Sequence, residues 1–353
     1  MKLLLVAELN ETNTFIDDIY NVLSKDAECD TGVDKFWNSS YNYDIIHIHW
    51  PENLFNWLEP TKTQLVLLKH RLKYWYSKSK IIVTRHNYYP HYKKTLKFLE
   101  LYEIVYSSAR AIIHLGNFSK HEYLIRYKAL AFTNKQIHYI IPHQVYSKLP
   151  NTFTQKEARR KLSIPQNKKV ILVFGSLRSS EELNIVLRSF KSLKIRDKFL
   201  VANAWPSQEQ FKRIRIDLKL INFLKTAFLS KDQYMLYNKK VNSNELQSLF
   251  KASNLVLIPR KESLNSGNLA LGFTYGKVVV GPNSGNIGEI LINSGNPVYN
   301  NFNNKDVSIA LEQGLLADQQ GLGEENLKYG LTNWNLDLIV QLHLKAYSFL
   351  LSI

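Results

Sequence analysis

Short apolar runs recur along this chain of 353 residues, and segments of helical length separate them. In the first half, these runs predict strands at Leu3–Ala7, Ile45–His49, Ile81–Thr84, Ala111–His114 and Ile137–Ile141. In the second half, they predict strands at Val170–Phe174, Phe199–Ala202, Met235–Tyr237, Leu255–Ile258 and Lys277–Val280. Strands that alternate with helices are typical of parallel, doubly wound sheets. The predicted fold class is therefore α/β.

The two sets of strands predict two Rossmann-like domains that face a cleft. A chain of 353 residues is longer than one hydrophobic core usually supports, which favours the same division. We expect a first domain at residues 1–150 and a second at residues 151–333, joined by a polar, basic linker with a short helix at Ser147–Lys169. Residues 334–353 are apolar at helical spacing and predict a final helix.

The excess of basic over acidic residues indicates an anionic partner. The chain has 46 Lys and Arg against 30 Asp and Glu, a formal net charge of +16. Nucleic acid, a membrane surface and a phosphorylated substrate all fit that excess. Cys29 is the one cysteine, which excludes an internal disulfide and fits a reducing cytoplasm. Residues 1–9 are interrupted by Glu8 and predict a strand rather than a signal peptide.

Histidines gather where the predicted strands of the first half end. Ligands of doubly wound sheets bind beyond the carboxyl ends of the strands, so residues there are candidates for a binding site. Six of the ten histidines lie in or beside these ends: His47, His49, His86, His91, His114 and His143. One histidine is more often structural, but several at one edge favour a site. His47 and His49 are two residues apart on a predicted strand, so their side chains point to the same face. This spacing also suits a pair of metal ligands.

In the second half, residues 253–291 have the pattern of an anion site. A predicted strand leads into a polar loop at 260–268. The loop ends with Ser266-Gly267-Asn268, just ahead of an apolar segment at Leu269–Tyr275. Serine, glycine and asparagine leave the first amides of a helix available to a ligand, such as a diphosphate. The loop at Gly175 has the same strand, glycine and helix order, and Arg178, Arg260 and Lys261 are candidate cations. The alternative is a plain βαβ unit whose glycines only form turns.

The motifs of both halves together resemble those of bacterial GT-B glycosyltransferases of glycan biosynthesis. The resemblance spans nearly the whole chain in order. In the first half it rests on Asp44 with His47–Glu52, His86-Asn87 with Pro90-His91, and Ile141–His143 with Tyr146. In the second half it rests on Pro259, Glu262, Ser266-Gly267, Gly276–Val280, Pro282, Gly285 and Glu289. The chain departs from the family at Ala270, where many relatives have a glutamate that holds the ribose. It departs again at Glu181-Glu182, near the family's Lys-Gly pair.

This resemblance implies a GT-B fold whose final helix crosses back to the first domain. It implies transfer of a hexose-type sugar from a nucleotide diphosphate sugar, a UDP or GDP sugar, to a saccharide acceptor that is lipid-linked. Such enzymes need no cofactor, and they bind diphosphate with amides and basic side chains rather than a metal. The donor-binding residues would be Gly175, Arg178, Arg260, Lys261, Glu262, Ser266, Gly267, Asn268 and Glu289.

In the first domain, the resemblance implies three candidate catalytic residues. Glu52, His86 or His91 would be the base of an inverting reaction, and His86 would orient the donor sugar in a retaining one. Acceptor or sugar binding would fall to His49, Trp50, Asn87, His143 and Tyr146. The rival hypothesis, which Ala270 favours, is a catalytically silent GT-B protein that binds sugars or supports a partner enzyme.

Residues 61–99 form a basic and aromatic segment without any acidic residue. Such a segment suits an anionic membrane, with rings at the headgroup level, and also single-stranded nucleic acid. The chain has no RNA-binding motif, which favours the membrane and a lipid-diphosphate acceptor over nucleic acid. We therefore expect a cytoplasmic protein that is peripheral on the inner face of the plasma membrane.

Overall fold

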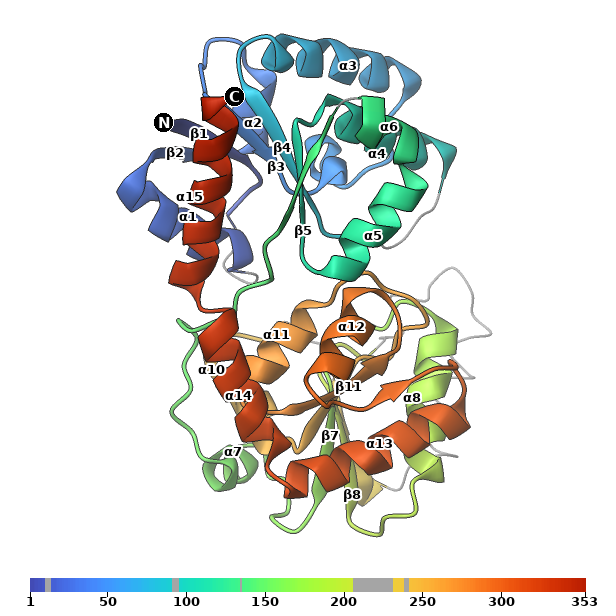
Figure 1. Cartoon of the computed structure of the whole chain (residues 1–353). Coiled ribbons are helices and arrows are strands. Elements are labelled where there is room, and N and C mark those ends of the chain that lie inside the picture. Colours follow the sequence, from blue (N-terminus) through green and yellow to red (C-terminus); the bar gives the residue numbers. More distant parts are fainter. Residues whose placement is uncertain (10–13, 91–94, 134, 206–230, 238–240) are drawn as a thin grey trace. The chain divides into compact units, whose positions relative to one another are not determined.

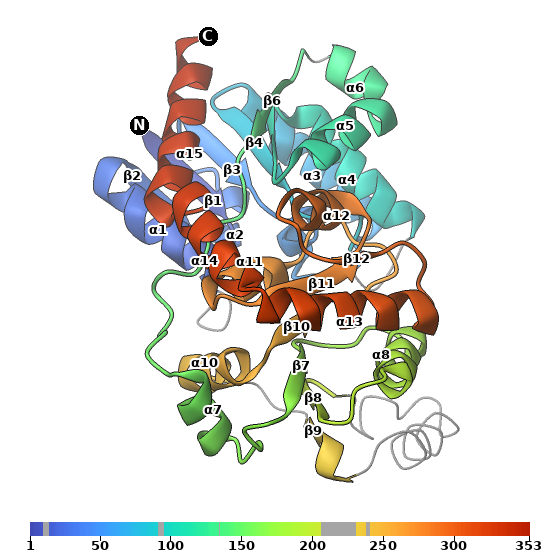
Figure 2. The same ribbon diagram turned by 60° about the horizontal axis from the view of Figure 1, so that its bottom comes forward.

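The computed structural model describes residues 1–9, 14–90, 95–133, 135–205, 231–237 and 241–353. The chain divides into two compact units (Figures 1 and 2). Unit 1 contains Met1–Gln144 and Trp334–Ile353, and unit 2 contains Val145–Asn333. Each unit is built on a parallel six-stranded sheet with helices packed on its faces, which confirms the predicted α/β class.

The sheet of unit 1 has the order β2-β1-β3-β4-β5-β6. Its strands are β1 (Lys2–Val6), β2 (Glu28–Thr31), β3 (Ile45–Ile48), β4 (Lys80–Arg85), β5 (Ala111–His114) and β6 (Ile137–Ile140). The helices are α1 (Phe15–Asp26), α2 (Val33–Trp37), η1 (Pro51–Phe55), α3 (Lys62–Tyr76), α4 (Leu96–Ser108), α5 (Asn117–Arg126), α6 (Lys128–Thr133) and α15 (Leu336–Ser352).

Alternate residues of the unit 1 strands bury two hydrophobic clusters, one on each face of the sheet. Leu4 and Val6 pack with α2, α3 and α4, whereas Leu3 and Leu5 pack with α1 and α15. This alternation is expected because successive side chains of a strand point to opposite faces. The final helix, α15, lies against α1 in both views and buries Tyr347 in the second cluster. The expectation that it packs on the first domain is confirmed.

The sheet of unit 2 has the order β12-β11-β10-β7-β8-β9. Its strands are β7 (Lys169–Val173), β8 (Lys198–Ala202), β9 (Tyr234–Leu236), β10 (Leu255–Leu257), β11 (Val278–Pro282) and β12 (Val298–Tyr299). The helices are α7 (Gln155–Lys161), α8 (Ser180–Ser192), η2 (Lys231–Gln233), α10 (Ser243–Ala252), α11 (Gly267–Thr274), α12 (Gly285–Asn293), α13 (Asn304–Gln319) and α14 (Leu322–Asn333).

Close helix packing in unit 2 places the loop at 260–266 against the start of α12. Gly285 has a φ of +63°, and a Cβ there would lie 2.2 Å from the carbonyl oxygen of Ser263. Only glycine fits this backbone conformation and approach without strain. The glycine turn that the sequence indicates is therefore a packing requirement that fixes the loop. None of the described helices is long and apolar enough to span a bilayer.

Candidate functional site

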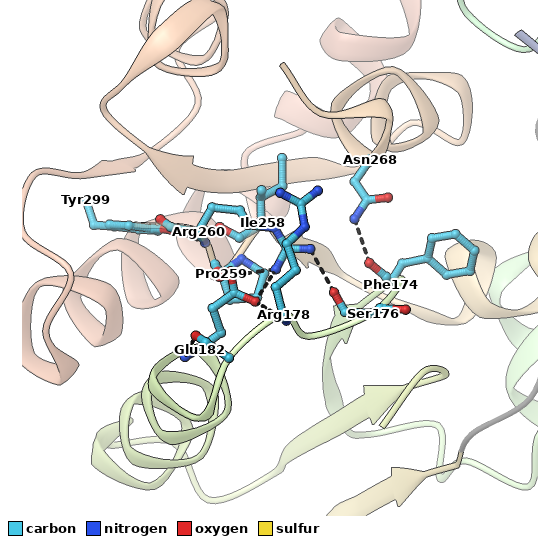
Figure 3. A network of polar contacts seen from close by, with 10 residues as sticks. Phe174, Ser176, Arg178, Glu182, Ile258, Pro259, Arg260, Asn268 and Tyr299 are labelled. Carbon is cyan, nitrogen blue, oxygen red and sulfur yellow. Dashed lines mark hydrogen bonds and ion pairs between the residues drawn. The ribbon is translucent and has the colours of Figure 1, made fainter. Parts of the chain in front are cut away.

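In unit 2, the loop that follows β7 is joined to its neighbours by hydrogen bonds at the carboxyl edge of the sheet. Gly175 has a φ of +83°, and its N–H donates to Oδ1 of Asn203, which follows β8, at 2.9 Å. Nδ2 of Asn268, in the first turn of α11, donates to the carbonyl of Phe174 at 2.6 Å (Figure 3). The ends of β7 and β8 and the start of α11 are therefore held together, as the predicted diphosphate site requires.

The N-terminus of α11 has no side-chain cap, a feature that it shares with α1, α2, α5 and α12. Its N-cap residue, Ser266, makes no side-chain capping hydrogen bond, whereas Ser179 caps α8 by accepting from the amide of Glu182. The first amides of a helix have no partner within the helix and carry its positive dipole end. The amides that begin α11 are thus suited to an anion, in agreement with the sequence prediction for Ser266, Gly267 and Asn268.

Arg178 and Arg260 come from the two loops that follow β7 and β10 (Figure 3). Nη1 of Arg260 lies 2.6 Å from Oε2 of Glu182, and its Nη2 donates to the carbonyl of Ser176 at 2.8 Å. The side chain of Arg178 extends away from Glu182 in the same view. Burial raises the pKa of Glu182, although the charges of Arg260 and Arg178 oppose that shift. Two arginines and one carboxylate therefore lie together at this edge of the sheet.

The other predicted donor residues lie around this edge. Lys261 and Glu262 are exposed, and Nζ of Lys261 is 3.6 Å from a carboxylate oxygen of Glu181. Glu289 is half-buried in α12. Ala270, the position at which relatives place a ribose-binding glutamate, is 1% exposed, so it presents no side chain to a ligand.

The sequence predicts Tyr146 as one of the acceptor- or sugar-binding residues of the first domain, whereas the structure places it in unit 2. Tyr146 belongs to unit 2, where its backbone N–H donates to Oγ1 of Thr274 in α11 at 3.0 Å. A Cβ on Gly267 would lie 3.6 Å from its hydroxyl oxygen. The first segment of unit 1 ends at Gln144, close to the predicted domain boundary at residue 150.

In unit 1, an imidazole and aromatic cluster lies where β3 and β4 end. Nδ1 of His49 and Nε2 of His86 are 3.1 Å apart, and the ring of His86 stacks on Trp50 with centroids 4.3 Å apart. Phe15, at the start of α1, contacts His86 edge-on at 5.3 Å and lies 4.6 Å from the ring of His143. The structure thus brings together four residues that the sequence predicts separately.

Two histidines of this cluster, His49 and His143, are neutral at physiological pH. Burial lowers the pKa of His49 to about 3 and that of His143 to about 4. Nε2 of His49 is buried and has no hydrogen-bond partner among the described residues. A neutral ring can donate or accept one hydrogen bond, but it offers no charge to a phosphate.

Glu52 and Asn87 lie near the cluster but are buried. Glu52 is 1% exposed, and its Oε2 accepts a hydrogen bond from the hydroxyl of Tyr102 at 2.8 Å. Burial raises the pKa of Glu52, and hydrogen bonds from Tyr102 and Asn87 oppose the shift. His91, the third candidate base, lies outside the described residues.

His47 has a structural role. Its Nδ1 lies 2.7 Å from the hydroxyl of Tyr347 in α15, and its Nε2 lies 2.7 Å from Oγ1 of Thr84. Both ring nitrogens are therefore engaged by the protein, which leaves His47 unsuited to the metal ligand pair that the spacing allows.

Phe15 is the member of the imidazole and aromatic cluster that sequence reasoning missed, because only its place at the start of a helix marks it.

Comparison with known proteins shows which class of fold this is. The chain matches sucrose-phosphate synthase from Thermosynechococcus elongatus with a TM-score of 0.76 and 13% identity, over 99% of both chains. It matches a glycosyltransferase from Rickettsia africae with a TM-score of 0.71 and 15% identity, over 99% of this chain and 98% of that one.

A third match is HepE from Anabaena, solved in complex with UDP. Its TM-score is 0.69 and its identity 12%, over 99% of this chain and all of HepE. No protein-family model and no curated protein sequence matches the chain. The chain has the GT-B fold, as its motifs predict.

Proposed function

We propose that this protein is a glycosyltransferase that transfers a sugar from a nucleotide diphosphate sugar to a saccharide acceptor. The observation that carries the proposal is the edge of unit 2, where two arginines, a glycine in the left-handed region and the uncapped start of α11 follow neighbouring strands, an arrangement that suits an anion. HepE, which has the same fold, was solved in complex with UDP-glucose. A nucleotide diphosphate sugar is therefore the ligand class that best fits the site.

In this scheme, unit 2 holds the leaving group. The amides of Ser266, Gly267 and Asn268 and the guanidinium of Arg178 face the diphosphate, and they stabilise the charge that develops as the nucleotide leaves. Gly175 lets the backbone approach the phosphates. Lys261, Glu262 and Glu289 complete the donor side, and Tyr146 joins them because of its position beside Gly267.

In the same scheme, unit 1 binds the uncharged sugar groups of the substrates. The ring of Trp50 and the imidazoles of His86 and His143 suit sugar hydroxyls and the apolar face of a sugar ring, and the buried rings of Phe15 and His49 pack against them. We assign the role next to the reacting sugar to His86. Glu52 is bonded to Tyr102 and buried, so we assign it to holding η1 and Asn87 in place.

We further propose a lipid-linked acceptor and a peripheral position on an anionic membrane, at the cytoplasmic face. The supporting surface is α3 with the start of α4, where Val66, Tyr76 and Leu96 are exposed beside Lys62 and Lys73. This surface is less basic than the sequence indicates. Lys69 pairs with Glu100 at 3.2 Å, and Arg85 is buried in an ion pair with Glu122.

The test is a panel of UDP, GDP, ADP and dTDP sugars offered to the purified protein. Slow hydrolysis of one donor, with release of its nucleoside diphosphate, supports the enzyme. A ligand at 100 times its Kd also stabilises the folded protein by about 2.7 kcal/mol, which a melting curve detects. Stabilisation by a donor that is never hydrolysed or transferred would favour the silent sugar-binding protein. An absence of both effects would overturn the proposal.

A further inference from the structure

Glu182 joins the two cationic loops of unit 2 (Figure 3). Its Oε2 accepts a hydrogen bond from the backbone N–H of Arg178 at 2.6 Å and pairs with Nη1 of Arg260 at 2.6 Å. Nη2 of Arg260 reaches across to the carbonyl of Ser176 at 2.8 Å. One carboxylate and one guanidinium therefore tie the loop after β7 to the loop after β10.

The pair is largely removed from water. The side chains of Arg260 and Glu182 are 11% and 9% exposed. Loss of one partner from a buried ion pair leaves the other charge uncompensated, so each of these residues depends strongly on the other. The backbone of Arg260 is also fixed, because its N–H donates to the hydroxyl of the buried Tyr299 at 2.9 Å. Arg260 is thus held by protein groups from three directions.

We propose that Glu182 and Arg260 form a clasp that positions Arg178 and the amides of residues 175–179 for the donor diphosphate. Arg260 acts through that loop rather than on the phosphates. The clasp rests on the proposed function and refines it, since it moves Arg260 from a ligand-binding role to a positioning role. It also gives a role to Glu182, a buried acid in the first turn of α8. Here the acid holds an arginine that the next loop supplies.

The first test compares the affinities of Glu182→Ala, Arg260→Ala and the double variant for a nucleoside diphosphate. The probe is whichever of UDP, GDP, ADP and dTDP the unaltered protein binds most tightly. Because both residues act as one unit, each single variant should weaken binding about 10-fold, and the double variant should weaken it no further. If Arg260 contacts phosphate directly, Arg260→Ala should be much weaker than Glu182→Ala, and this result would overturn the clasp.

The conservative variant Glu182→Gln separates positioning from charge. Its amide oxygen can still accept from both Arg178 and Arg260, but the guanidinium of Arg260 loses its counter-charge, so binding should lie between that of Glu182→Ala and that of the unaltered protein. Binding weaker than that of Glu182→Ala would contradict the clasp, because the retained hydrogen bonds would then contribute nothing to positioning. Glu325→Ala is the control, since Glu325 is an exposed glutamate of α14, outside both loops, and should have little effect.

Backbone hydrogen exchange gives a readout that does not depend on any ligand. Glu182→Ala should speed exchange in both loops, at residues 175–183 and 259–264, while α13 remains protected. Faster exchange in only one loop, or in neither, would overturn the clasp. If the unaltered protein binds no nucleotide at all, the proposed donor function fails, and the exchange data still decide whether the two loops are coupled.

Discussion

The two units are both built on parallel six-stranded sheets, although the strand orders differ, and they present contrasting chemistry where their central strands end. Each sheet has six parallel strands, and in both the polar residues follow the strands that end near its centre. In unit 1 those residues are imidazoles and aromatic rings, whereas in unit 2 they are arginines, a carboxylate and a glycine. Two sheets of the same kind therefore carry imidazole and aromatic rings at the end of one and charged side chains at the end of the other.

Burial explains the difference between the two edges. Removal from water penalises a charged imidazole, so His49 and His143 stay neutral below their usual pKa. An arginine keeps its charge even when buried, and Glu182 compensates the guanidinium of Arg260. From this difference between the units, we assign phosphate binding to unit 2 and sugar recognition to unit 1 in the proposed function. The following predictions can break or sharpen that assignment, from the largest effect to the smallest.

The largest effect should come from His86→Ala. Since His86 lies next to the reacting sugar in our scheme, the variant should lose about 100-fold or more in turnover, as expected for a positioned polar or proton-transfer group. Turnover and Tm should be measured on the same preparation, with His70→Ala, an exposed histidine of α3, as the control. A lower Tm with near-normal turnover of the folded fraction would make His86 structural. A variant that keeps both would remove it from the site.

A smaller effect is expected for Glu262→Ala in unit 2. Glu262 is exposed in the loop that precedes α11, so the protein should fold normally while kcat/KM for the donor falls about 10-fold. Glu325→Ala, an exposed glutamate of α14, is the matched control. Unchanged kcat and KM would show that Glu262 belongs to the surface and not to the donor side.

The neutral state of the unit 1 histidines predicts how stability depends on pH. The folded-state pKa of His343 is about 4 and that of His49 about 3, whereas an unfolded histidine has a pKa of about 6.5. Between about pH 6.5 and 4, the unfolded state therefore binds more protons, and stability falls as the pH falls. Tm should be highest above pH 6.5 and decline steadily through this window. A Tm that rises on acidification would mean that these rings are charged in the folded protein.

The smallest effect concerns the membrane. Binding to anionic vesicles should exceed binding to neutral ones and weaken as salt is added, because the exposed lysines of α3 supply the attraction. Co-sedimentation at low and high salt measures this. Equal binding to both kinds of vesicle, or binding to neither, would remove the membrane from the account.

The sequence predicts the inner strands well because these strands are buried on both faces and appear as continuous apolar runs. It misses β2 and β12, which lie at the sheet edges. Strand β2 is rich in polar residues, and β12 has only two residues. Sequence also indicates Arg178 and Ser266, since each follows a strand and precedes a helix. It cannot show the pairing of Glu182 with Arg260, 78 positions apart, nor the position of Tyr146 beside Gly267. Such contacts depend on the packing of distant segments.

The most direct test of the division between the units is calorimetric titration of three proteins with the preferred nucleoside diphosphate. Arg178→Ala should weaken binding about 10- to 100-fold, as expected for loss of a charge-assisted contact. His86→Ala should bind the diphosphate within about 2-fold of the unaltered protein, because our scheme places His86 next to the sugar and gives the phosphates to unit 2. If His86→Ala lost the diphosphate and Arg178→Ala kept it, the assignment of phosphate to unit 2 would be contradicted.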